Sequence, residues 1–246
     1  MSRKSRFDDR PRNTYAEHTR KPVHSLIFVA PLLIAFHWGA ARYGTALLAL
    51  RDLDRILRYF GATTPYLPPL LILAVLLIQQ YFYKGSWKIQ PKVLAGMLCE
   101  SIAWTIPLVV FSHFTGRRGA VAAATLPGEW EKFAQKLMVA AGAGLYEEFL
   151  FRLVLVSGAM LLFVDVFEAH RDVVAVVAVV LSAVAFSVYH LTGPEFRGWA
   201  GLPWGPLIFR TLAGMYLGFL YVKRGYGVAV WTHALFDVYV LVGLQR

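Results

Sequence analysis

About seven apolar segments, most of them near the roughly 20 residues that a helix needs to cross a bilayer, recur along this chain. A backbone surrounded by hydrocarbon must satisfy its own hydrogen bonds, and a helix does so within itself. We therefore predict an all-α fold, a polytopic transmembrane helix bundle of about seven spans. The segments cover residues 25–43, 69–83, 93–114, 133–164, 173–191, 207–222 and 228–244.

Composition supports a chain that is embedded in lipid. Hydrophobic residues make up 57% of the chain and charged residues only 16%, against roughly 25% in a typical soluble domain. Aromatic residues reach 15%, as expected where Trp and Tyr line the two lipid–water boundaries. A chain of 246 residues that contains this many spans leaves little room for a separate soluble domain. We expect a multi-pass integral membrane protein, with the compact length favouring a prokaryotic cytoplasmic membrane.

Basic residues concentrate at the amino terminus of the chain, whose formal net charge is +10. Because positive charge favours the cytoplasmic side of a membrane, we predict that residues 1–22 form a basic, disordered cytoplasmic tail. We expect this tail to contact the lipid bilayer and expect no nucleic-acid partner. Residues 23–246 then form a single transmembrane domain, with the catalytic motifs in residues 133–244. The basic residues of the tail are Arg3, Lys4, Arg6, Arg10, Arg12, Arg20 and Lys21.

Two stretches depart from a simple crossing of the membrane. The apolar segment 133–164 is too long for a straight crossing, so we expect a tilt, a break or a partly interfacial start. Residues 44–60 carry apolar and charged side chains on opposite sides of a helix, which predicts an interfacial amphipathic helix. The apolar side has Leu50, Leu53, Leu57 and Phe60, and the charged side has Arg51, Asp54, Arg55 and Arg58.

Ionisable residues lie inside three of the apolar segments, where they are expensive and usually mark function. Glu148 and Arg152 are four residues apart, so they share a helix face and are predicted to form a buried structural pair. Glu147 is rotated by about 100° from Glu148 and is the candidate general base. The small residues 142–144 allow neighbouring helices to approach. We expect them to bring His190 and His233 close to Glu147.

His190 and His233 complete the candidate site together with Asp237. His190 closes the segment 173–191 at the depth of a membrane boundary, where water can enter. His233 and Asp237 are four residues apart and therefore share a helix face. The six residues Glu147, Glu148, Arg152, His190, His233 and Asp237 are thus candidates for buried acid–base chemistry.

Three short motifs in these segments resemble those of the CPBP family of intramembrane proteases. The motifs are EEFLFR (147–152), FSVYH (186–190) and HALFD (233–237). That family includes the CAAX prenyl endopeptidases of the Rce1 type and bacteriocin-processing or immunity proteins. The resemblance implies a glutamate-dependent peptidase without a cofactor, in which Glu147 and His190 activate a water. It also implies that His233 binds the oxyanion with help from the last motif position, while Glu148 and Arg152 support the site.

The last position of the third motif is Asn or Asp in the family, and here it is Asp237. An amide can donate a hydrogen bond to an oxyanion, whereas an ionised carboxylate cannot. Asp237 is therefore either a protonated donor or a carboxylate that orients His233 by accepting from its ring. We favour the orienting role.

Two other classes of function use the same residues. A metal-dependent membrane hydrolase would take Glu147, His190 and His233 as ligands, although the sequence lacks a tight ligand cluster. A transporter or scaffold would use the ionisable groups as a proton relay. The single cysteine, Cys99, excludes an internal disulfide and is expected to be a small core residue. The substrate is expected to be a membrane-associated peptide or protein, such as a prenylated tail, a leader peptide or a sorting tail.

Overall fold

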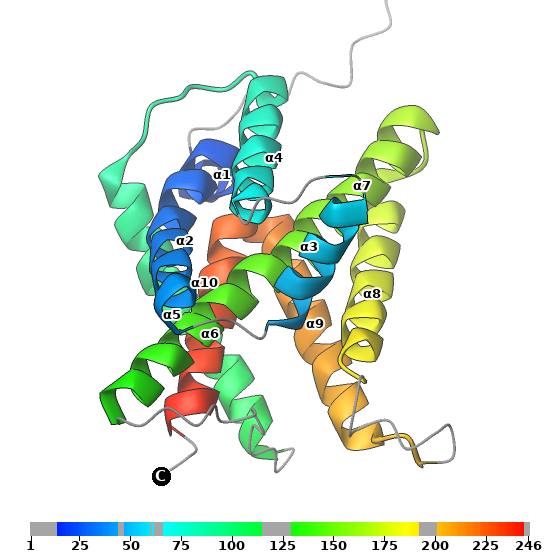
Figure 1. Cartoon of the computed structure of the whole chain (residues 1–246). Helices are drawn as coiled ribbons and strands as arrows, with labels where there is room; N and C mark the ends of the chain where they lie inside the picture. The colour runs from blue at the N-terminus through cyan, green and yellow to red at the C-terminus, as the bar shows by residue number, and fades with distance from the viewer. Residues whose placement is uncertain are drawn as a thin grey trace, which may run out of the picture.

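The computed structural model of the chain describes residues 14–43, 47–59, 61, 66–114, 129–191 and 201–243. Its elements over these ranges are helices without a strand, which confirms the predicted all-α bundle (Figure 1). Six helices of this part are long and apolar enough to cross a membrane. They are α2 (Pro22–Tyr43), α5 (Pro91–Phe114), the continuous helical stretch Trp130–Val166, α8 (Arg171–Tyr189), α9 (Trp204–Arg224) and the stretch Tyr226–Gly243.

A seventh apolar helix, α4 (Leu67–Tyr83), coincides with the predicted segment 69–83 but has only 17 residues. Two prolines at its start, Pro68 and Pro69, suit the first turn of a helix, where the missing N–H has no intrahelical partner. With 17 residues, the helix is shorter than the roughly 20 residues of a straight crossing. The described chain has the predicted apolar segments, but length qualifies six of them as membrane spans.

The stretch Trp130–Val166 is the longest helical segment described, with 37 residues. It begins at the second residue of α6 (Glu129–Glu148) and continues through the π-helix η1 (Phe149–Val156), the short α7 (Ser157–Ala159) and the π-helix η2 (Met160–Val166). At about 1.5 Å of rise per residue, such a helix exceeds the roughly 30 Å of a hydrocarbon core. Figure 1 shows it running obliquely past α10 and α8, and its helical elements follow one another without a break.

The core lies on both sides of α6, and many apolar side chains point outward. One cluster joins α2, α4 and α6 through Phe36, Ile72 and Leu145, all of which are buried. Helix α10 (Tyr226–Val238), continued by η5 (Tyr239–Gly243), packs against α5, α6 and α9. Large apolar side chains such as Trp38 and Leu181 are exposed, as expected where the solvent is lipid. Cys99 is also exposed on α5, so its predicted place in the core is wrong.

The amphipathic helix α3 (Leu48–Tyr59) forms within the predicted stretch 44–60, of which residues 44–46 and 60 lie outside the described ranges. Ala49 and Leu53 are buried in the cluster around α6. Arg51 and Arg55 are exposed on the other side of the helix. The alternation of apolar and charged residues therefore predicted both the helix and its buried face correctly.

The expected disorder of residues 1–22 needs correction at its carboxyl-terminal end. Residues 1–13 lie outside the described ranges, but Tyr15–Arg20 forms the helix α1. The Tyr15 hydroxyl donates to Glu100 of α5 (3.0 Å), and the guanidinium of Arg224 donates to the same carboxylate (2.7 Å). Burial raises the pKa of Tyr15 to about 12. This segment folds because its polar side chains find partners on two neighbouring helices, which local charge does not reveal.

Helices α6 and α10 approach each other closely at Gly144. A Cβ built on Gly144 would lie 2.8 Å from the carbonyl oxygen of Val230 and 2.9 Å from the Cβ of Ala234. A residue with a side chain would therefore push the two helices apart. By contrast, a Cβ built on Gly158 meets nothing within 4 Å.

We expect Gly144→Val to destabilise the protein, because overpacking a tight contact typically costs about 1–3 kcal/mol. The control Gly158→Ala should leave stability unchanged or slightly higher, since Ala favours a helix. Thermal unfolding in detergent, followed by tryptophan fluorescence, measures both. Equal midpoints for the two variants would show that the approach at Gly144 is not needed.

Candidate active site

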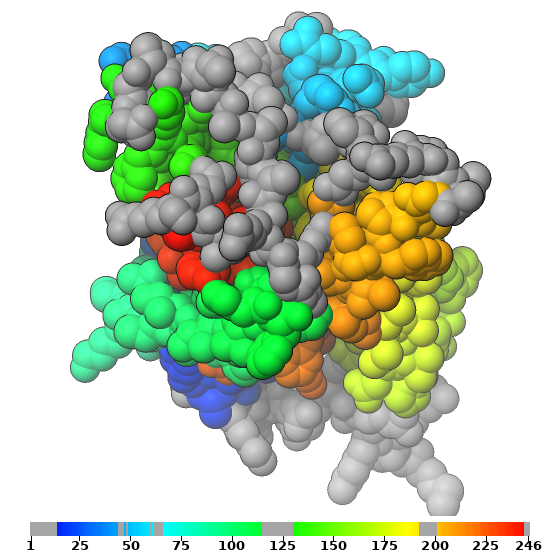
Figure 2. Space-filling model, turned by 90° about the horizontal axis from the view of Figure 1, so that it is seen from below, coloured from blue at the N-terminus to red at the C-terminus, as the bar shows by residue number. Residues whose placement is uncertain are grey.

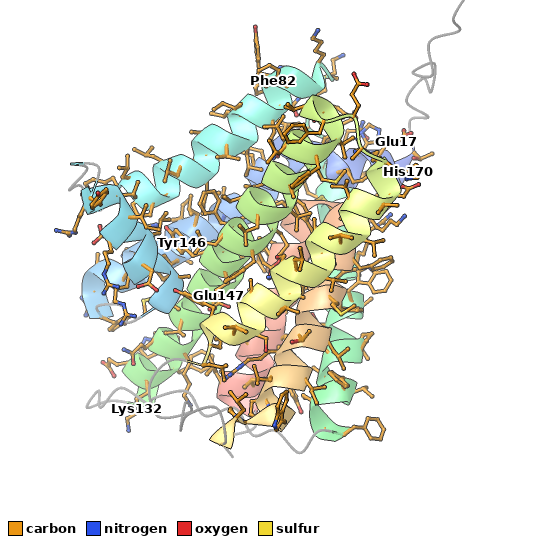
Figure 3. The ribbon with its side chains drawn as sticks, turned by 90° about the vertical axis from the view of Figure 1, so that its right-hand side faces the viewer. Glu17, Phe82, Lys132, Tyr146, Glu147 and His170 are labelled. Atoms are coloured by element: carbon orange, nitrogen blue, oxygen red, sulfur yellow. The ribbon has the colours of Figure 1, made fainter. Side chains whose placement is uncertain are left out.

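The candidate catalytic carboxylates lie where α6 changes into the π-helix η1. Glu147 and Glu148 are the last two residues of α6, and Arg152 belongs to η1. Single π-helical turns are often found at functional sites. Glu148 and Arg152 are fully buried, whereas 7% of Glu147 is exposed. Figure 3 shows Glu147 in the interior of the bundle, close to the end of α8.

Glu147 faces both histidines, as the sequence predicted. Its Oε1 lies 3.5 Å from Nε2 of His190, and its Oε2 lies 3.8 Å from Nε2 of His233. These separations are longer than typical hydrogen bonds. Three helices that are distant in the sequence thus bring one carboxylate between two imidazole nitrogens.

His233 is held by Glu148. Its Nδ1 is 2.8 Å from Oε1 of Glu148, and both residues are buried. Asp237 lies on the other side of the ring, with Oδ2 at 3.6 Å from Nε2. Asp237 is the residue that the sequence predicts to orient this ring. In the structure, the hydrogen bond to this ring is made with Glu148, whereas Asp237 stays 3.6 Å from Nε2.

Glu148 therefore has two partners, of which the sequence indicated only one. Its Oε2 lies 3.2 Å from Nε of Arg152, four residues further on, as predicted. Arg152 also donates from Nη2 to the carbonyl of Gly214 on α9 (3.0 Å) and lies over the ring of Phe186, 5.0 Å from its centroid. The periodicity of a helix revealed the contact with Arg152, but nothing local to the motif indicated the contact with His233.

His190 lies at the end of α8, where the helix leaves the core. Its Nδ1 is 2.8 Å from the carbonyl oxygen of Phe186, which directs Nε2 towards Glu147. The side chain of His190 is 20% exposed and that of Asp237 is 24% exposed. Exposure thus rises from Arg152, which is buried, to these two residues. Water is therefore expected to reach Glu147 between His190 and Asp237.

Figure 2 views the molecule from the end at which α8 ends and α9 begins. The end of α10, which carries Asp237, lies there among α5, α6 and α9. Among the described residues, no group of three or more His, Cys, Asp or Glu is arranged to hold a metal ion. Glu147, His190 and His233 are close together, but their arrangement does not identify a metal site.

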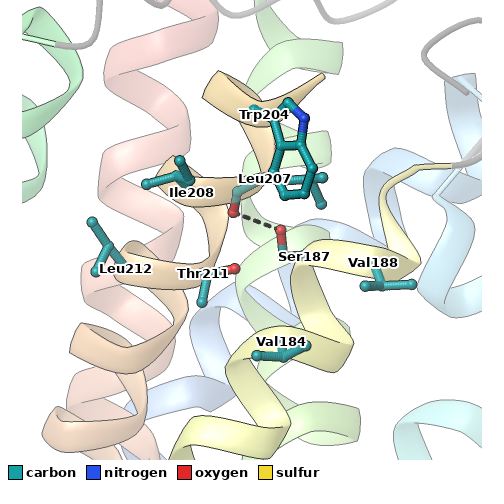
Figure 4. A pocket seen from close by; sticks show the side chains of 8 residues that line it. All are labelled: Val184, Ser187, Val188, Trp204, Leu207, Ile208, Thr211 and Leu212. Carbon is teal, nitrogen blue, oxygen red and sulfur yellow. Dashed lines mark hydrogen bonds between the residues drawn. The ribbon is translucent and has the colours of Figure 1, made fainter. Parts of the chain in front are cut away.

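An apolar groove of about 320 Å³ lies between α8 and α9 (Figure 4). The hydroxyl of Ser187 donates to the carbonyl of Leu207 there, at 2.8 Å. No acidic residue or histidine lines this groove, so it is separate from the site around Glu147. The lining residues are Val184, Ser187, Val188, Trp204, Leu207, Ile208, Thr211 and Leu212.

Residues 129–239 match the family model described as type II CAAX prenyl endopeptidase Rce1-like. The matched range contains all six residues of the candidate site. No curated protein and no solved structure matches the chain.

We expect Arg152→Ala to destabilise the protein, since removing one partner of a buried ion pair typically costs about 3–5 kcal/mol. The reason is that Glu148 would remain buried without its cation. The control Arg58→Ala removes an exposed arginine that pairs with Asp54 at 2.7 Å and should change little. Detergent unfolding midpoints of the two variants test this. A fully stable but inactive Arg152→Ala protein would instead place Arg152 in the catalytic machinery.

Proposed function

Since residues 129–239 of this chain form a domain of the type II CAAX prenyl endopeptidase Rce1-like family, we propose that Glu147 activates the water that this protease uses. The family is one of hydrolases, and the apolar helices make this member a multi-pass membrane protein. The chain is accordingly a CAAX-type intramembrane protease. The observation that carries the proposed mechanism is the position of Glu147 between Nε2 of His190 and Nε2 of His233.

The first step is the activation of a water held between Glu147 and His190. The carboxylate accepts one proton of the water while the water oxygen attacks the carbonyl carbon of the substrate peptide bond. Nε2 of His190 faces Oε1 of the same carboxylate, so it can share this proton. The gap of 3.5 Å suits an apo site, because catalytic hydrogen bonds often tighten only when the substrate binds.

The second requirement is a donor for the oxyanion that develops on the carbonyl oxygen. His233 meets it if both of its nitrogens carry protons: Nδ1–H donates to Glu148, and Nε2–H points towards Glu147 and Asp237. Glu148 would then stabilise the charged ring and fix its direction. Asp237 lies on the Nε2 side, where a protonated carboxyl could add a second donor.

The tetrahedral intermediate then collapses. The proton taken up by Glu147 and His190 passes to the amide nitrogen, and the carbon–nitrogen bond breaks. One product carries a new carboxylic acid, which then ionises, and the other a new amine, so the oxygen and both hydrogens of the water are accounted for. Glu147 returns to its ionised form without a covalent intermediate.

We propose a membrane-associated peptide as the substrate, with a prenylated carboxyl-terminal CAAX tail as the first candidate because of the family's name. A leader peptide and a membrane-anchored sorting tail are the other two candidates. Purified protein would be incubated with one peptide of each kind, and the products identified by mass spectrometry. We propose a prokaryotic cytoplasmic membrane as the location of the protein.

The same assay distinguishes a metal-dependent hydrolase from a glutamate-dependent one. A glutamate-dependent mechanism predicts that cleavage persists after treatment with a strong chelator and that metal analysis finds no stoichiometric ion. Loss of cleavage with the chelator, and its return with added Zn²⁺, would favour Glu147, His190 and His233 as ligands. A transporter or scaffold would cleave none of the peptides.

We expect Glu147→Gln to lower cleavage by roughly 100-fold or more, the usual scale for losing a positioned general base. The amide keeps the shape of the side chain but cannot accept the proton of the water. Glu168→Gln, the same change at an exposed position, is the matched control. Near-normal cleavage by a folded Glu147→Gln protein would falsify the assignment.

The role of Asp237 is tested by Asp237→Asn. If Asp237 acts as a protonated donor on the Nε2 side of His233, the amide can replace it. Activity should then persist in the variant and extend to higher pH, where a carboxyl would ionise. If Asp237 acts as an ionised partner of the ring, the variant should lose activity at every pH. Cleavage rates measured from about pH 5 to pH 9 distinguish the two roles, with Asp165→Asn as an exposed control.

A further inference from the structure

The position of His190 depends on the last turn of α8. His190 caps that helix, with φ −84° and ψ −1°, and the helix ends beside it. Within its own helix the ring is held by the carbonyl of Phe186. Its backbone carbonyl lies 3.5 Å from Nη1 of Arg210, which is long for a hydrogen bond. Helix ends fray easily, so the preceding side chain, Tyr189, matters for the placement of His190.

Tyr189 connects this turn to two other elements. Its ring packs edge-on against Phe151 of η1, with centroids 5.5 Å apart, and against His190 at 5.8 Å. Its hydroxyl donates to Oδ2 of Asp52 on α3, at 2.7 Å. The ring of Tyr189 thus contacts η1, and its hydroxyl is hydrogen-bonded to α3.

Asp52 is suited to hold a hydroxyl. The hydrogen bond from Tyr189 lowers the pKa of the Asp52 carboxyl below its ordinary value, and Arg51 and Arg55 lie near its other oxygen. The carboxylate is therefore ionised at neutral pH, and hydrogen bonds to a charged acceptor are stronger than those between neutral groups.

Helix α3 itself is firmly placed. Ala49 and Leu53 are buried in the cluster that contains Leu145 and Tyr146, the residues just before Glu147. The same helix therefore packs against α6 beside the carboxylate and is hydrogen-bonded to the turn of α8 that carries the histidine. It lies outside residues 129–239, the part of the chain that the family model matches.

We propose that Tyr189 and Asp52 are positioning residues, which keep Nε2 of His190 directed at Glu147 by fastening the end of α8 to α3. This inference rests on the proposed function, in which Glu147 and His190 act on one water. It adds a surface helix from the first half of the chain to the residues on which the reaction depends. Neither Tyr189 nor Asp52 contacts the reacting atoms.

The test uses the full-length protein with Tyr189→Phe, Asp52→Asn and the combination of the two. Tyr189→Phe keeps the packing of the ring and removes only the hydroxyl. Asp54→Asn is the matched control, because Asp54 lies on the same helix and pairs with Arg58. The first readout is the rate at which diethyl pyrocarbonate modifies His190, followed by mass spectrometry of peptides. His170, which is exposed, is the internal reference.

We expect Tyr189→Phe to raise the modification rate of His190 by about three- to tenfold, the scale of one lost hydrogen bond. The double variant should show no further rise, because both changes remove the same bond. Asp54→Asn and the rate at His170 should not change. If Tyr189→Phe leaves the rate at His190 unchanged, or Asp54→Asn raises it equally, the inference is wrong.

The second readout is cleavage of a farnesylated peptide that ends in a CAAX sequence. We expect a lower kcat with little change in KM for Tyr189→Phe, while the unfolding midpoint stays near that of the wild type. A lower midpoint with an unchanged kcat would reduce Tyr189 to a structural residue. If wild type and Glu147→Gln cleave equally or not at all, the proposed function fails, and the modification rate still decides the inference on its own.

Discussion

The rest of the site depends on the contacts that the buried carboxylate of Glu148 makes. It binds Nε of Arg152 with one oxygen and Nδ1 of His233 with the other. Arg152 in turn reaches the carbonyl of Gly214, so one anion links α6, η1, α9 and α10. A charge of this kind is stable away from water only while its partners stay in place. The need to keep the charge of Glu148 next to its partners therefore also fixes the positions of the helices that carry them.

The two adjacent glutamates have different surroundings, because the turn of the helix directs their side chains to different sides. Glu148 points into the core and is fully buried, whereas Glu147 faces the two Nε2 atoms and keeps a small exposure. Exposure increases further towards His190 and Asp237. A dry interior on one side strengthens electrostatic interactions, and the more exposed side is where the proposed mechanism would draw its water.

The first half of the chain contributes to this arrangement although it lies outside the matched family domain. Phe36 of α2 packs in the same cluster as Leu145, and a Cβ added at Gly142 would collide with the Phe36 ring. The contact between Asp52 and Tyr189 joins α3 to the end of α8. Helices α2 and α3 therefore pack against the helices that carry the motifs. The matched part of the chain depends on the first half of the chain for this packing.

The sequence alone determined the features that follow from length and from the period of a helix. Apolar runs near the thickness of a bilayer predicted the helices, and spacings of four residues predicted that Glu148 would meet Arg152 and that Asp237 would approach His233. Tertiary structure alone decided which carboxylate holds Nδ1 of His233, how α1 docks on Glu100 and Arg224, and where α3 meets Tyr189. These contacts join residues 85 or more positions apart, as in the pair of Glu148 and His233. Local periodicity fixes the face on which a side chain lies, but only the packing of helices decides which distant face it meets.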